Sequence, residues 1–221
     1  MNTKPMTGFT LIEVALAMAI TALVGLSVAG ATMVLSTTYQ QGENYQDYVQ
    51  SARSSSLRLQ TLLRRAKLIT SCTTTSIVFW AGDANSDSQI NVSELVRVSY
   101  NTATKELHES QLDLSGLPPA TAAVIDSVLP LSTAMDEGAV CTLLGVTYKN
   151  YCDDRLLANN VRSVEFRADY APPSTHRVSL RLDVGDGEQN LVVQPAVTLR
   201  SPCTDRVGIA NNQYVLVQGA L

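Results

Sequence analysis

A long apolar run near the N-terminus dominates the hydrophobic pattern of this chain. Residues 14–35 contain no Asp, Glu, Lys or Arg. At 1.5 Å of rise per residue, a helix over this run would be roughly 33 Å long, close to the ~30 Å hydrocarbon core of a bilayer. The pattern therefore predicts a helix that is long enough and apolar enough to span a membrane.

After residue 35 the pattern becomes amphipathic. Apolar residues recur at helical spacing, while Gln, Ser, Arg and Asp fill most of the other positions. The apolar stripe consists of Tyr45, Val49, Ala52, Leu59, Leu63 and Ala66, with Ser56 in its one gap. We therefore expect a nearly continuous helix over about residues 9–68, whose second half packs on a sheet.

The rest of the chain shows the shorter period of β-strands. Residues 76–80 are β-branched and aromatic, and Trp80 is expected in the core. Alternating segments predict a hairpin and three further strands, at 95–100 with 105–110, and at 161–168, 177–184 and 191–199. Pro195 favours an edge position or a bulge in the last of these strands. The predicted fold class is α+β: a long N-terminal helix packed on an antiparallel β-sheet head.

One carboxylate, Glu13, lies at the start of the apolar run. A charge inside a membrane helix costs at least ~2.5–3.5 kcal/mol, so it needs a partner. A short polar leader with one positive charge, Lys4, comes before it and ends in Gly8. Cleavage after Gly8 would keep the apolar helix and expose a new α-amino group on Phe9, four residues from Glu13.

The stretch Gly-Phe-Thr-Leu-Ile-Glu-Val at residues 8–14 resembles the signal of type IV prepilins and type II secretion pseudopilins. The resemblance implies cleavage between Gly8 and Phe9 by a prepilin peptidase and methylation of the Phe9 amine. It also implies that Glu13 pairs with the Phe9 amine of a neighbouring subunit during filament assembly. Unlike many major pilins, the chain has no helix-kinking Pro near Gly30. The order of the later elements resembles J-type minor pseudopilins and PilW-like minor pilins.

The pattern and the resemblance together divide the chain into four parts. Residues 1–8 would be the leader peptide and 9–35 the transmembrane and filament-core helix. Residues 36–70 would form an amphipathic helix that continues into the head, and 71–221 the β-rich head. We expect a single-pass protein of the inner membrane, with its head in the periplasm or outside the cell. The expected partners are other pilin or pseudopilin subunits, the prepilin peptidase and inner-membrane lipid.

Residues 83–94 have the ligand spacing of an EF-hand calcium loop, in a form that resembles dockerin loops. Oxygen-bearing side chains stand at loop positions 1, 3, 5, 9 and 12, and position 7 can offer its backbone carbonyl. The candidate ligands are Asp83, Asn85, Asp87, Gln89, Asn91 and Glu94. Position 6, normally Gly, is Ser88, and a strand replaces the entering helix. The alternative is a surface turn in which Asx side chains cap their own backbone. Any bound calcium would be structural.

Four cysteines, Cys72, Cys141, Cys152 and Cys203, follow the membrane segment. The positive-inside tendency keeps Lys4 in the cytoplasm and sends the head outward, where thiols are expected to pair. Three pairings are possible. We favour Cys141–Cys152, which closes a short loop, together with Cys72–Cys203. Free buried thiols are the alternative.

Composition narrows the function classes. The net charge is −4, from 16 basic and 20 acidic residues, and no basic block favours nucleic-acid binding. His108 and His176 belong to no catalytic pattern, so we expect no enzyme. The predicted function is a minor pilin or pseudopilin at or near a filament tip, in a type IV pilus or a type II secretion system. The alternative is a calcium-dependent adhesin that uses the pilin anchor.

Overall fold

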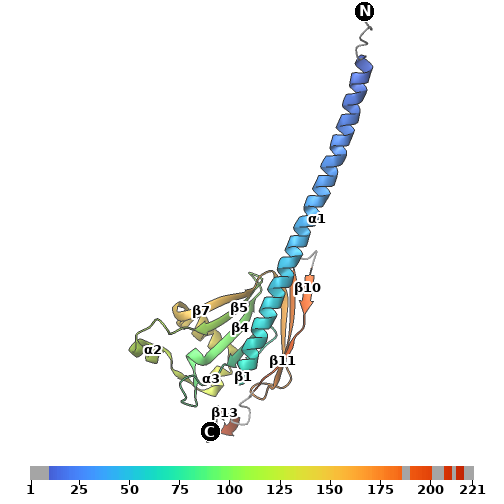
Figure 1. Cartoon of the computed structure of the whole chain (residues 1–221). Coiled ribbons are helices and arrows are strands. Elements are labelled where there is room, and N and C mark those ends of the chain that lie inside the picture. The colour runs from blue at the N-terminus through green and yellow to red at the C-terminus, as the bar shows by residue number, and fades with distance from the viewer. Residues whose placement is uncertain (1–9, 186–189, 201–206, 211–212, 217–221) are drawn as a thin grey trace, which may run out of the picture. The chain divides into compact units, whose positions relative to one another are not determined.

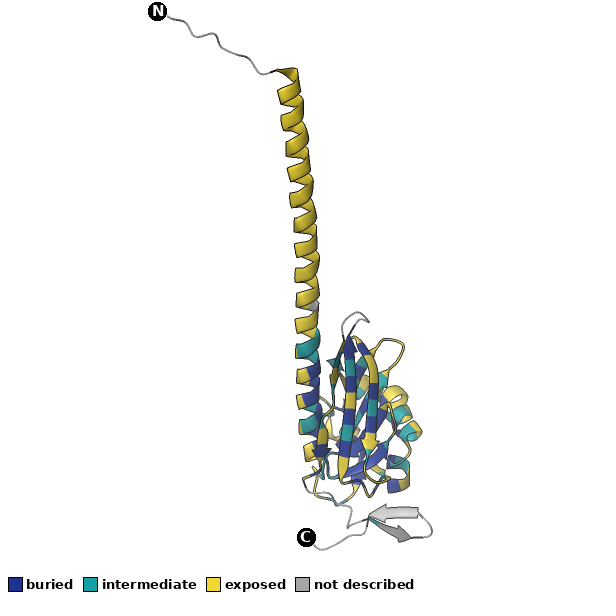
Figure 2. Ribbon diagram, turned by 90° about the vertical axis from the view of Figure 1, so that its right-hand side faces the viewer, coloured by how far each residue is buried: buried dark blue, intermediate teal, exposed yellow. Residues whose placement is uncertain are grey.

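The computed structural model describes residues 10–185, 190–200, 207–210 and 213–216. The chain divides into two compact units, residues 1–46 and 47–221. The described part of the first unit is helical from Leu11 onward and belongs to helix α1 (Leu11–Arg65), which continues into the second unit (Figure 1). Every described side chain from Thr10 to Asp47 is exposed, and buried positions along α1 begin only beyond this point (Figure 2).

The second part of α1 packs through the predicted apolar stripe from Ala52 onward, whereas Tyr45 at the start of that stripe is 42% exposed. Ala52, Leu59 and Leu63 are at most 1% exposed, which confirms this face of the helix. The helix ends at Arg65, whereas the sequence pattern predicted an end at about residue 68. The chain becomes a strand at Leu68, because this short segment includes the β-branched residues Ile and Thr and can bury both of its faces.

The first sheet is antiparallel and has five strands in the order β1–β2–β4–β5–β7. β2 lies inside it, and all five of its residues are buried, Trp80 among them. The predicted hairpin is confirmed by the pairing of β4 with β5, in which Val98 is opposite Glu109. The strands are β1 (Leu68–Cys72), β2 (Ser76–Trp80), β4 (Leu95–Asn101), β5 (Glu106–Leu112) and β7 (Cys152–Ala158).

The second sheet is built around β9 (Arg177–Gly185). β8 (Val161–Ala168) pairs along one side of β9, and β10 (Asn190–Val193) and β11 (Ala196–Thr198) pair in turn along the other. The single strand predicted at 191–199 is therefore split. The split falls at Pro195, which has no N–H to donate and only accepts a bond from the Leu180 N–H at 2.9 Å. The edge position predicted for Pro195 is confirmed.

One apolar core joins α1 to both sheets. Every second side chain along the strands faces this core. Phe79 in β2 and Leu182 in β9, for example, pack in one cluster with Leu59 and Leu63 of α1. The backbone N–H of Phe166 in β8 donates to the carbonyl of Thr74, between β1 and β2, at 2.9 Å and links the two sheets. The antiparallel sheets and the long helix together form an α+β, pilin-like fold.

A second core covers the opposite face of the first sheet. Val78, Trp80 and Leu95 pack there against buried residues of three short helices and a π turn. The segment from 113 to 151 supplies this layer. It contains α2 (Pro119–Ile125), β6 (Val128–Leu129), α3 (Leu131–Ala134), α4 (Glu137–Thr142), η2 (Leu143–Thr147) and η3 (Lys149–Tyr151). Short elements elsewhere are β3 (Ile90–Asn91), η1 (Val92–Glu94), β12 (Val207–Ala210) and β13 (Gln213–Leu216).

A bidentate ion pair ties α1 to the first sheet. Nη2 of Arg58 lies 2.9 Å from Oε1 of Glu109, and its Nε donates to Oε2 at 3.1 Å. The Glu109 side chain is 6% exposed and that of Arg58 is 39% exposed. The hydrogen bonds to Glu109 raise the pKa of Arg58. The buried carboxylate therefore depends on this one guanidinium for its charge balance.

Replacing Arg58 with Ala is expected to destabilise the head. The change leaves the Glu109 carboxylate buried without its partner, which we expect to cost about 1–2 kcal/mol because solvent already weakens a half-exposed pair. Thermal or urea unfolding of the purified chain measures this loss. Arg53→Ala, at an exposed position of the same helix, is the control and should stay within about 0.5 kcal/mol. Equal effects of the two changes would contradict a role for the pair.

Candidate functional site

The start of α1 is capped by Thr10. The Oγ1 of Thr10 accepts the backbone N–H of Glu13 at 3.4 Å, and its own N–H and O–H both donate to Oε2 of Glu13 at 2.9 Å. This reciprocal arrangement is a capping box, in which two backbone donors at a helix start are satisfied. Glu13 is thereby held at the first turn of α1.

The capping box leaves part of the Glu13 carboxylate available. A carboxylate has two oxygens and about four lone-pair sites, and only Oε2 is engaged by Thr10. Glu13 is the only charged residue from 11 to 42. No cationic side chain in the described part of the chain pairs with it. The site therefore presents a negative charge, held in place on one side and without a counter-ion among the described residues.

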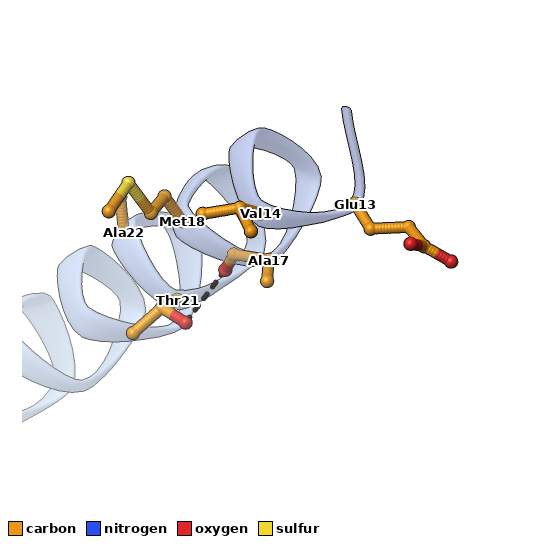
Figure 3. Close-up of a pocket in the computed structure, with 6 residues that line it drawn as sticks. All are labelled: Glu13, Val14, Ala17, Met18, Thr21 and Ala22. Atoms are coloured by element: carbon orange, nitrogen blue, oxygen red, sulfur yellow. Dashed lines mark hydrogen bonds between the residues drawn. The ribbon is translucent and has the colours of Figure 1, made fainter. Parts of the chain in front are cut away.

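A shallow groove runs from Glu13 along one face of α1, lined by Glu13, Val14, Ala17, Met18, Thr21 and Ala22 (Figure 3). Apart from Glu13 and Thr21, its walls are apolar. The hydroxyl of Thr21 donates to the carbonyl of Ala17 at 2.8 Å, so its polar group is satisfied within the helix. The hydroxyls of Ser27 and Thr32 bond the carbonyls four residues earlier in the same way. These bonds suit a helix that must satisfy its polar groups without water.

By length and composition, α1 is the one helix in the described ranges that could cross a membrane. Its window of highest hydropathy is not covered by the rest of the chain. The predicted cleavage position, Gly8 and Phe9, lies outside the described residues. The geometry of the processing site therefore remains a prediction from the sequence.

A comparison with known families matches residues 4–29 to the prokaryotic N-terminal methylation motif. The matched segment contains the capped Glu13 and the first half of the apolar run. Comparisons with curated proteins and with solved structures gave no significant match. The motif and the α+β fold with its apolar N-terminal helix support a pilin-like or pseudopilin-type protein. Such proteins are structural subunits processed by a prepilin peptidase and assembled with other pilin subunits.

The predicted calcium loop joins the end of β2 to the start of β4. Both carboxylate oxygens of Asp83 accept backbone N–H groups, from Asp87 at 3.0 Å and from Ser88 at 2.8 Å. Asp87 accepts the N–H of Gln89 at 2.7 Å, and Asn85 donates to Asp87 at 2.9 Å. The structure therefore brings the first half of the predicted ligand set together by Asx turns.

The second half of the loop is buried. Glu94 is 4% exposed and accepts three hydrogen bonds. Its Oε2 receives the indole N–H of Trp80 at 2.9 Å and the N–H of Asn91 at 3.2 Å, and its Oε1 receives the N–H of Ala84 at 2.6 Å. Within the ranges that the structure describes, no three His, Cys, Asp or Glu side chains are gathered closely enough to hold a metal ion. The three loop carboxylates thus bond to N–H groups rather than converge on one point.

The structure has no disulfide among the cysteines that it describes. Cys72, Cys141 and Cys152 are free thiols, so the favoured Cys141–Cys152 bond is not formed here. The Cys152 thiol instead donates to the carbonyl of Leu144 at 3.0 Å. Burial raises the pKa of the Cys72 and Cys152 thiols, which favours their protonated form. Cys203, the expected partner of Cys72, lies outside the described residues.

Two partners of the site residues were missed by sequence reasoning. The Thr-x-x-Glu spacing of Thr10 and Glu13 is the signature of a capping box and could have identified the first. The indole of Trp80 was expected only in the core. Its bond to Glu94 joins the end of β2 to the last position of the loop, and no local sequence signal encodes such a contact.

Replacing Ser88 with Gly is expected to stabilise the head. Ser88 has φ = 60° and so lies in the left-handed region, which costs a residue with a side chain about 1–2 kcal/mol. Because Gly is also more flexible when unfolded, we expect a net gain of about 0.5–1 kcal/mol in the free energy of unfolding. Ser115→Gly, in an exposed turn without a positive φ, is the control and should not stabilise. A loss of stability in Ser88→Gly would contradict the turn geometry.

Proposed function

We propose that this chain is a minor subunit of a type IV pilus or of a type II secretion pseudopilus, anchored by α1. One observation carries the proposal: within the methylation motif, Glu13 stands at the start of α1 and is the only charged residue from 11 to 42. An anchor that only held the head on a membrane would be more stable without this charge. The charge is explained if it is needed for a contact that forms after processing.

The contact follows from the chemistry of the processed end. Cleavage after Gly8 would place a positively charged amine on Phe9, and methylation keeps that charge. The amine of one subunit and Glu13 of its neighbour would attract strongly in a medium of low dielectric constant, where each alone is costly. The capping bonds from Thr10 hold Oε2 of Glu13, so Oε1 is available for an amine that approaches from outside the helix.

The rest of the exposed helix fits the same role. Its apolar side chains would lie in the inner membrane before assembly and against the helices of other subunits afterwards. The hydroxyls of Thr21, Ser27 and Thr32 are satisfied within the helix, so exchanging lipid for protein would expose no unpaired polar group. The head would lie outside the inner membrane, in the periplasm or beyond.

We place the subunit at or near the filament tip. The layer formed by residues 113–151 covers the second face of the first sheet and makes the head thicker than a helix packed on one sheet. Heads along a filament shaft are crowded by neighbours on all sides, whereas a subunit at the end has one free side. The added layer supports a tip position for this reason.

Replacing Glu13 with Gln is expected to leave processing intact and to reduce incorporation into filaments. Gln can keep the capping box with Thr10, so the change removes the charge and little else. Losing a pairing of this kind should lower incorporation about 10-fold or more, since each 1.4 kcal/mol is a factor of ten. The measurement is the ratio of this chain in sheared filaments to that in membranes, with the intact mass as the check on processing.

The matched control is Glu43→Gln, which removes the next acidic residue along the same helix, beyond the apolar run. It should be processed and incorporated like the unmodified chain. Normal incorporation of Glu13→Gln, or an equal defect in both variants, would overturn the proposed pairing.

A further inference from the structure

We propose that the loop from Asp83 to Glu94 binds one calcium ion that braces the head. The inference concerns a metal site, and it stands or falls independently of filament assembly. Oxygen donors occur at the spacing that a twelve-residue calcium loop requires, and they include three carboxylates and two side-chain amides. They are Asp83, Asn85, Asp87, Asn91 and Glu94, with the backbone carbonyl of Gln89 between them.

The first half of the loop is already curled. Asp83 accepts N–H groups from residues four and five positions later, which turns the chain back on itself. Ser86 and Ser88 adopt the left-handed conformation, with φ of 62° and 60°, at loop positions 4 and 6. Each carboxylate oxygen has two lone pairs, so an N–H bond leaves room for a cation. These turns alone would also suit an ordinary surface loop, and the case for an ion rests on the second half.

The second half contains a buried negative charge that has no counter-ion in the described ranges. Glu94 is 4% exposed, and its hydrogen bonds come only from neutral N–H donors. No ion pair within the described part of the chain includes this residue. Buried carboxylates normally pair with a cation or coordinate a metal, because neutral donors compensate only part of the lost hydration. A divalent cation at the loop would supply the missing charge.

Asn91 points to the same missing partner. It is 4% exposed, and the Glu94 N–H that faces its side chain in a capping box makes no hydrogen bond to it, so its buried Oδ1 has no donor among the described residues. Its backbone N–H is bonded to the carboxylate of Glu94, so the two buried groups adjoin each other. A buried oxygen without a partner is costly, and a cation satisfies it as a donor would. Asn91 is at loop position 9 and Glu94 at position 12. The oxygen without a donor and the carboxylate without a counter-ion therefore both belong to expected calcium ligands.

Calcium fits this donor set better than magnesium does. The donors are all oxygens from flexible side chains and one carbonyl, and Ca²⁺ accepts six to eight such ligands in irregular geometry. Mg²⁺ demands a near-ideal octahedron and keeps several waters. Because no three acidic side chains in the described ranges converge on one point, binding must draw Asp83 and Asp87 toward Glu94. The ion would thus tighten the loop around the end of β2.

The position of the loop gives the ion a structural effect. Ile90 and Val92 of the loop pack in the second core together with Trp80 and Leu95. The N–H of Ser93 donates to Asp126, just after α2, at 3.0 Å. Ordering the loop would therefore stabilise the contact between the first sheet and the helical layer that covers it.

Trp80 provides a direct readout, because it is the only Trp in the chain and its indole bonds to Glu94. The full chain in detergent micelles is treated with a chelator, dialysed and titrated with calcium chloride. We expect a saturable change in Trp fluorescence with a midpoint of roughly 0.1–1 mM, the range of extracellular calcium modules, and a higher unfolding temperature. Magnesium chloride at the same concentrations should produce neither change.

Two variants test the ligands and one controls for turn chemistry. Asp83→Asn and Asp87→Asn keep side chains that can still form the turns, and each should weaken calcium binding about 10-fold or more. Asp113→Asn changes an acid that makes a similar turn with Ser115 outside the loop and should bind calcium normally. The proposal is overturned if the unmodified chain shows no saturable fluorescence change and no shift in unfolding temperature. It is also overturned if all three variants behave alike.

Discussion

The carboxylate of Glu13, at the start of the uncharged first part of α1, is the constraint on which the rest of this molecule depends. Glu13 has no cationic partner among the described residues, and its capping box with Thr10 holds the carboxylate in place without neutralising it. The charge is tolerable at a membrane surface and costly within apolar surroundings. A helix of this kind is therefore suited to two states, one in lipid and one beside a neighbour that brings a positive charge.

The head holds the C-terminal part of α1. The buried stripe of α1 packs on two sheets at once, and the pair between Arg58 and Glu109 fixes it to the first of them. The same sheet has a second core on its far face, which depends on the loop from Asp83 to Glu94 and on the helical layer after it. The proposed calcium ion would bind at this loop and so stabilise the second core. Anchoring and head stability thus rest on separate sets of contacts.

The sequence predicted those parts that local patterns encode. Helical spacing identified the stripe around Leu59 and Leu63, and alternation identified the hairpin of β4 and β5. β1 was missed because Leu68 continues the apolar spacing of the helix, and only the packing of the folded chain makes the segment a strand. Most of the helical layer at 113–151 was not predicted, because its short elements are ordered by the sheet face beneath them. For the site, the motif identified Glu13, whereas the contact between Trp80 and Glu94 depends on tertiary structure.

The intact mass of the chain, extracted from membranes of cells with an active prepilin peptidase, tests the central claim most directly. Pairing of Glu13 with a neighbour requires a free amine on Phe9, and that amine exists only after cleavage. The account predicts a chain that begins at Phe9 and carries one methyl group on its amine, whereas cells with an inactive peptidase should yield the full-length form. A chain that keeps residues 1–8 in the presence of the active enzyme would contradict the account.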